Sequence, residues 1–81
     1  MKKVGKQDKQ FEKMRANHNN WRIDQIEVIA KRYNVVVRKT KGSHVILSHP
    51  EWIELLSIPA HRPIKPIYIK KFVQLIGLLK G

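Results

Sequence analysis

The chain has 81 residues, a length that predicts one small domain over residues 1–81. It has 17 lysines and arginines against 6 aspartates and glutamates, and its formal net charge of +11 predicts a polyanionic partner. It has no cysteine, which excludes disulfides, a thiolate nucleophile and a cysteine-ligated zinc site. A chain without cysteine also fits the reducing environment of the cytoplasm, where we expect the protein to be located. No apolar run approaches the length of a bilayer span, and the basic residues are spread over several segments, so nucleic acid is favoured over a membrane as the partner.

A short helix is predicted near the N-terminus. Residues 1–10 are polar and basic, and we expect them to be flexible. Phe11 and Met14 lie three positions apart, which gives a helix over residues 8–16 one apolar edge.

A longer helix is predicted after Asn20. The polar residues 17–20 form a turn and supply side chains that can cap this helix. We expect it to end at Asn34, because asparagine tolerates the left-handed backbone conformation. Its apolar residues recur at spacings of three and four and form one stripe: Ile23, Ile26, Ile29, Ala30 and Tyr33.

Three short strands are predicted next, and the short turns between them make them antiparallel. They cover residues 35–39, 44–48 and 52–58, and Pro59 is expected to stop the last one. In the second strand, period two places Val45 and Leu47 on one face and His44 on the other. If Val45 and Leu47 face the core, His44 points away from it.

The chain is predicted to end in a helix that follows an extended linker, residues 60–65. Pro66 suits its first turn, and Lys70 and Lys71 fall opposite its apolar stripe. That stripe consists of Ile69, Phe72, Val73 and Ile76. The fold class is therefore α+β, in the order α-β-β-β-α with an extra N-terminal helix. Both long helices are expected on one face of the sheet.

The tripeptide Gly42-Ser43-His44 is the most informative motif. It places His44 at the start of a predicted strand, close in sequence to Arg38, Lys39 and Lys41. RNA carries its own nucleophile, the 2′-hydroxyl, so cleavage needs a base, a proton donor for the leaving oxygen and positive charge, but no metal. Histidine exchanges protons near neutral pH and suits either proton-transfer role. The alternative is a polar strand residue that only binds a phosphate or a neighbour.

His61 and Arg62 form a second candidate pair, because they follow a strand end and precede a helix N-terminus, where anions collect. They would contact a phosphate, or His61 would supply the second proton-transfer group. The alternative is a pair that fixes the proline-rich loop. Lys70 and Lys71 would form a phosphate-binding ridge beside Tyr68, or else a solvated helix face.

No metal or other cofactor is expected. The spacings of His44, His49 and His61 match no standard ligand motif, and we expect no carboxylate except Glu51 to join them. The chain also lacks a nucleotide-binding glycine loop and a serine-centred elbow.

These motifs together resemble the HicA toxins of type II toxin–antitoxin pairs. The resemblance rests on Gly42-Ser43-His44, on residues 59–66 and on residues 68–72, and it covers roughly Trp21 to Ile76. Many HicA toxins have another histidine or a polar residue directly after the motif histidine, whereas Val45 follows it here.

The resemblance implies a fold similar to the double-stranded RNA-binding domain, ribosome-independent cleavage of mRNA and a HicB antitoxin that covers the active site. It also implies one essential histidine, which maps onto His44. The RNA-contacting candidates are Arg38, Lys39, Lys41, Ser43, His61, Arg62, Lys65, Lys70 and Lys71. Two alternatives remain at this point: a non-catalytic module that binds duplex RNA, and an inactive relative that only binds its partner.

Overall fold

A sheet and two layers of helices make up the part of the chain that the computed structural model describes, residues 9–61 and 63–80. Within it lie helices α2 (Lys9–Ala16), α3 (Ile23–Arg32) and α4 (Pro66–Lys80) and strands β1 (Val36–Lys39), β2 (His44–Ser48) and β3 (Leu56–Pro59). The sheet has the order β1-β2-β3, and both strand pairs are antiparallel. The α+β class and the predicted order of elements are confirmed.

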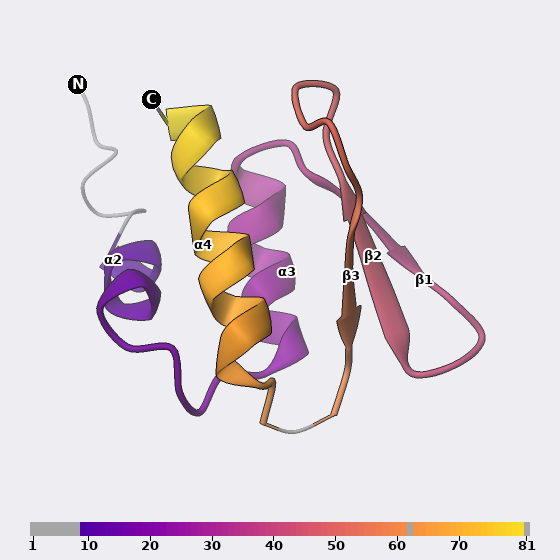
Figure 1. Ribbon diagram of the computed structural model, residues 1–81, viewed down its shortest axis with the longest axis horizontal. Helices are drawn as coiled ribbons and strands as arrows, with labels where there is room; N and C mark the ends of the chain where they lie inside the picture. The colour runs from indigo at the N-terminus through magenta and orange to yellow at the C-terminus, as the bar shows by residue number, and fades with distance from the viewer. Residues whose placement is uncertain (1–8, 62, 81) are drawn as a thin grey trace.

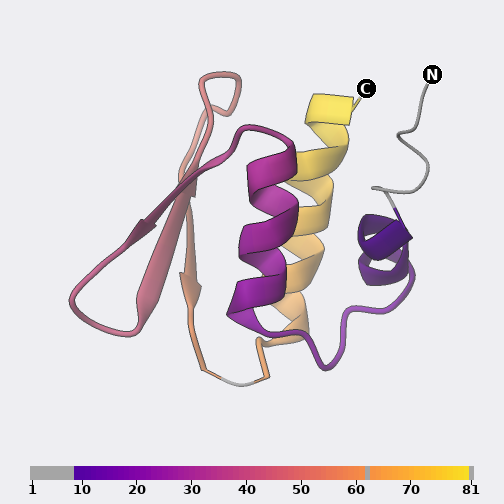
Figure 2. The ribbon, with the colours of Figure 1, turned by 180° about the vertical axis from the view of Figure 1, so that it is seen from behind.

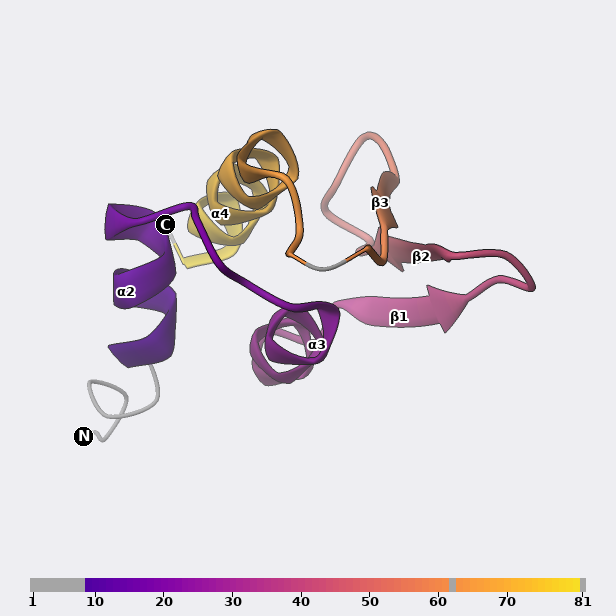
Figure 3. The ribbon, with the colours of Figure 1, turned by 90° about the horizontal axis from the view of Figure 1, so that it is seen from below.

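The layers follow from the apolar faces of the helices. Helices α3 and α4 cover one face of the sheet, and α2 lies beyond them, on the side away from the strands (Figure 1). Helix α3 lies beside β1 (Figure 2), and α4 lies on the β3 side (Figure 3). Among the described residues, no helix combines the length and the apolarity that crossing a bilayer requires.

The core confirms the predicted apolar stripes. Ile26, Ile29 and Ala30 of α3 are buried, as are all four stripe residues of α4. Val45 and Leu47 of β2 are buried too, whereas His44 is exposed. The period-two reading of this strand is therefore correct, and His44 points away from the core.

The helix ends differ in detail from the sequence predictions. Lys9 and Gln10 belong to α2 and are not a flexible tail; the rest of the expected flexible segment lies outside the described residues. Helix α3 is not capped by the polar residues 17–20. The side-chain oxygen of Gln25 instead accepts a hydrogen bond from the backbone N–H of Arg22, at 2.9 Å. Asn34 has φ 63°, so its predicted left-handed conformation at the end of α3 is confirmed.

The predicted third strand, residues 52–58, is wrong at both ends. Strand β3 begins only at Leu56, opposite Leu47, and Pro59 is its last residue rather than its stop, opposite His44. The backbone N–H of Trp52 donates to the carbonyl of His49 at 2.9 Å, so residues 49–52 form a turn, and the Trp52 side chain is buried. Proline has no backbone N–H to donate to a neighbouring strand. Pro59 is tolerated because β3 is an edge strand, so that one of its sides pairs with no strand.

Gly77 offers a direct test of helix α4. A Cβ at this position would meet no atom within 4 Å, and the residue lies in the interior of the helix. Because glycine loses more backbone entropy than alanine in a helix, we expect Gly77→Ala to raise the free energy of unfolding by about 0.5–1 kcal/mol. Urea denaturation followed by circular dichroism measures this change. An unchanged or lower stability would contradict the helical environment described for Gly77.

Candidate functional site

The β1–β2 hairpin fixes the backbone of His44. The backbone N–H and the hydroxyl of Thr40 both donate to the carbonyl oxygen of His44, at 3.2 and 3.0 Å. The next register pair joins Lys39 to Val45, whose side chain is buried. The hairpin thus anchors His44 through its main chain and leaves its imidazole exposed.

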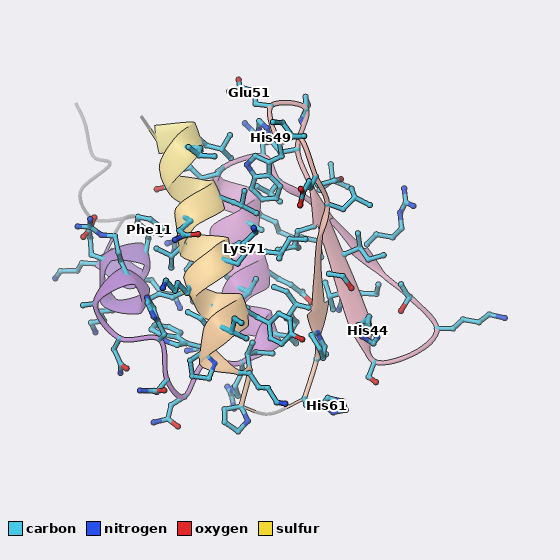
Figure 4. The ribbon with its side chains drawn as sticks, in the orientation of Figure 1. Phe11, His44, His49, Glu51, His61 and Lys71 are labelled. Atoms are coloured by element: carbon cyan, nitrogen blue, oxygen red, sulfur yellow. The ribbon has the colours of Figure 1, made fainter. Side chains whose placement is uncertain are left out.

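The pairing of β2 with β3 brings His61 to the same end of the sheet. His44 lies opposite Pro59, and the backbone N–H of Ala60 donates to the carbonyl of Ser43 at 2.5 Å. The chain therefore passes close to His44 just before it reaches His61. Figure 4 shows both histidines at the lower end of the sheet, near the beginning of α4.

A shallow pocket of about 420 Å³ opens at this end of the molecule. Its walls are formed by His44, Pro59, His61, Pro63, Lys65 and Tyr68. The prolines and the tyrosine ring supply apolar surface, while two imidazoles, an ammonium group and a phenol supply polar groups. In such a pocket one imidazole can accept a proton from a bound molecule while the other donates a proton to it. The ammonium group can stabilise negative charge that develops on that molecule.

The beginning of α4 holds Lys65 and Tyr68 at the pocket. The backbone N–H groups of Tyr68 and Ile69 donate to the carbonyl of Lys65, at 3.0 and 3.4 Å, which closes the first turn of the helix. Ile69 is buried and half-buried Tyr68 packs against the core, so one helical turn links the pocket to the hydrophobic core. Arg62, the other basic candidate in this loop, lies outside the described residues.

Lys39 is held in an ion pair, away from the pocket. Its ammonium lies 3.3 Å from a carboxylate oxygen of Glu27, whose side chain is only 17% exposed. Both residues line a second hollow of about 250 Å³, to which Gly42, Ser43 and His44 also contribute. His44 therefore stands between the two hollows, and an RNA phosphate that used Lys39 would have to compete with Glu27.

The remaining basic candidates are spread over the surface. Arg38 is exposed and lies opposite Ile46, on the sheet face that His44 shares, and Lys41 is exposed in the hairpin turn. Lys70 and Lys71 are exposed on α4 and do not line the pocket. Of the predicted site residues that the structure describes, the pocket brings together His44, His61 and Lys65.

Tyr68, Pro59 and Pro63 are pocket residues that were not among the predicted site residues. Sequence spacing placed Tyr68 beside Lys70 and Lys71, because all three lie early in one helix. The signal that could have found Tyr68 is its position two residues after Pro66, in a first helical turn that the preceding loop must approach.

His49 has a structural role at the other end of the sheet. Its Nδ1 accepts a hydrogen bond from the backbone N–H of Glu51 at 3.0 Å, and its ring lies 5.9 Å from that of Trp52. Figure 4 shows His49 and Glu51 far from His44 and His61. Within residues 9–61 and 63–80, no three histidine, aspartate or glutamate side chains form a group that could hold a metal ion.

Comparisons with known proteins add no family to this description. No protein-family model, no curated protein and no solved structure matches the chain.

Proposed function

We propose that this protein is an endoribonuclease and the toxin of a HicA-type toxin–antitoxin pair. The observation that carries the proposal is that His44 and His61, seventeen positions apart in the sequence, line one pocket together with Lys65. Two imidazoles and a cation are the groups that RNA cleavage through the 2′-hydroxyl needs.

In the proposed reaction the imidazole of His44 removes the proton of a ribose 2′-hydroxyl. The 2′-oxygen attacks the adjacent phosphorus, the bond from phosphorus to the 5′-oxygen breaks, and protonated His61 gives its proton to that oxygen. The products are a 2′,3′-cyclic phosphate and a 5′-hydroxyl. The ammonium of Lys65 stabilises the additional negative charge on the phosphorane. No step requires a metal ion.

The charge of the protein supports an RNA substrate. A net charge of +11 on 81 residues attracts polyanions. Exposed Arg38 and Lys41 extend the positive surface beyond the pocket. We propose that the substrate is mRNA in the cytoplasm and that a HicB-type antitoxin neutralises the protein by covering the pocket. These assignments rest on the resemblance of the motifs.

Incubation of the purified protein with RNA in excess EDTA tests this function. We expect fragments with cyclic phosphate and 5′-hydroxyl ends, formed at the same rate with and without the chelator. An oligonucleotide of the same sequence made entirely of 2′-deoxynucleotides should bind but stay intact, because it lacks the nucleophile.

The same assay distinguishes the proposed endoribonuclease from the non-catalytic alternative. A module that only binds duplex RNA gives salt-sensitive binding without fragments, and this result would overturn the proposal. The His44→Ala protein, purified in parallel, controls for contaminating ribonucleases, because fragments that appear equally in both preparations do not come from this pocket.

A further inference from the structure

A second surface feature lies away from the histidine pocket, between the β2–β3 loop and helix α4. It is an apolar groove of about 260 Å³ whose eight lining residues include Glu51, Ile53, Glu54, Leu55, Lys71 and Leu78. Three of its apolar side chains face solvent: Ile53 is 100% exposed, Leu55 65% and Leu78 69%. Clustered exposed apolar side chains of this kind mark interaction surfaces.

The charges of this groove differ from those of the rest of the molecule. The other described carboxylates form ion pairs: Glu12 with Arg15, Asp24 with Arg22 and Glu27 with Lys39. Glu51 and Glu54 form none with any described residue, although the chain carries an excess of cations. The groove therefore combines two available carboxylates, one ammonium group and an apolar floor. RNA is a poor occupant, because its phosphates would meet the carboxylates.

We propose that this groove is the surface through which two copies of the chain associate. A two-fold interface places the same patch on both partners, so the patch must complement itself. The groove carries both halves of such a contact, an exposed Ile53 beside an apolar floor and carboxylates beside Lys71, so in the proposed dimer Ile53 and Glu54 of one copy would meet the apolar floor and Lys71 of the other. Elsewhere two molecules of charge +11 repel each other, whereas this groove presents both carboxylates and an ammonium group, so each copy offers opposite charges to the other.

The arrangement leaves the histidine pocket accessible in both copies. Figure 4 shows Glu51 at the opposite end of the molecule from His44 and His61. The dimer would carry two basic surfaces, and a polyanion long enough to reach both would bind more tightly than to one copy. The groove is lined by eight residues, fewer than the about 20–30 per side of a standard interface, so we expect a weak dimer.

Sedimentation velocity of the full chain, from micromolar to submillimolar concentration, tests the proposal. We expect a concentration-dependent shift from monomer to dimer. Ile53→Ser should raise the dissociation constant at least about tenfold, because it removes the most exposed apolar side chain of the patch. The matched control is Ile67→Ser, since Ile67 is 70% exposed on α4 but does not line the groove. It should leave the dissociation constant unchanged.

A charge exchange gives a second, independent test. Glu54→Lys should weaken the dimer by placing two ammonium groups opposite each other, and the double variant Glu54→Lys with Lys71→Glu should restore it. Salt should strengthen the dimer, because the screening length falls from about 10 Å at 0.1 M to about 3 Å at 1 M, which reduces the long-range repulsion between the two cationic molecules, whereas an ion pair enclosed in the interface is screened much less.

Three results would overturn the proposal. The first is a protein that stays monomeric across the whole range of concentration and salt. The second is a dimer that responds equally to Ile53→Ser and Ile67→Ser, which would place the interface elsewhere. The third is a dimer that the double charge exchange fails to restore. None of these results bears on RNA cleavage, so the dimer and the proposed enzymatic function can fail separately.

Discussion

His44→Ala is expected to lower the rate of RNA cleavage by about 10²- to 10⁴-fold, the range for loss of a general base. The loss should appear in the single-turnover rate at saturating protein, because in the proposed reaction the imidazole transfers a proton and contributes little to binding. If the parent protein arrests the growth of cells that produce it, as a toxin should, the His44→Ala protein should not arrest growth. Single-turnover cleavage of a labelled oligonucleotide measures the effect directly.

The variant should keep its fold and its affinity for RNA. His44 is exposed, and the hairpin is closed by its carbonyl oxygen, which alanine retains. His49→Ala is the matched control: it removes another histidine of the sheet region, loses the ring contact with Trp52 and leaves the pocket intact. If His44→Ala cleaved RNA at the parent rate, or if His49→Ala lost cleavage while folded, the assignment of His44 would be wrong.

Much of the fold could be predicted because its signals are local. The alternation of Val45 and Leu47 with His44 identified the buried face of β2, and the spacing of the apolar residues in α4 identified its core stripe. The start of β3 could not be predicted in this way. Trp52 and Ile53 have side chains typical of strands, but the turn at His49 buries Trp52 in the core and leaves Ile53 fully exposed.

The candidate site was only partly predictable, for a similar reason. Sequence reasoning found His44 and His61 separately, each from its local motif. That they line one pocket depends on the pairing of His44 with Pro59 and on the course of the following loop. Lys39 shows the reverse case, because proximity in sequence suggested a phosphate ligand, whereas the structure pairs it with Glu27 across the α3–β1 packing.

His61→Gln is expected to lower cleavage of RNA by about 10²-fold or more, because the 5′-oxygen would then leave without a proton. In the proposed HicA-type mechanism His44 is the one essential histidine, so we assign to His61 the proton-donor role, which solvent can take over in part. Replacing the leaving nucleoside by p-nitrophenolate tests this role, since that leaving group departs as an anion and needs no general acid.

On the p-nitrophenyl ester of uridine 3′-phosphate, His61→Gln should therefore regain most of the parent rate, whereas His44→Ala should stay impaired, because the 2′-hydroxyl must still lose its proton. Both histidines are exposed, so neither variant disturbs packing in the core. A His61 variant equally slow on both substrates would show that His61 holds the phosphate rather than donating a proton. A His61 variant as fast as the parent on RNA would remove His61 from the mechanism, and the pocket would then act with His44 and Lys65 alone.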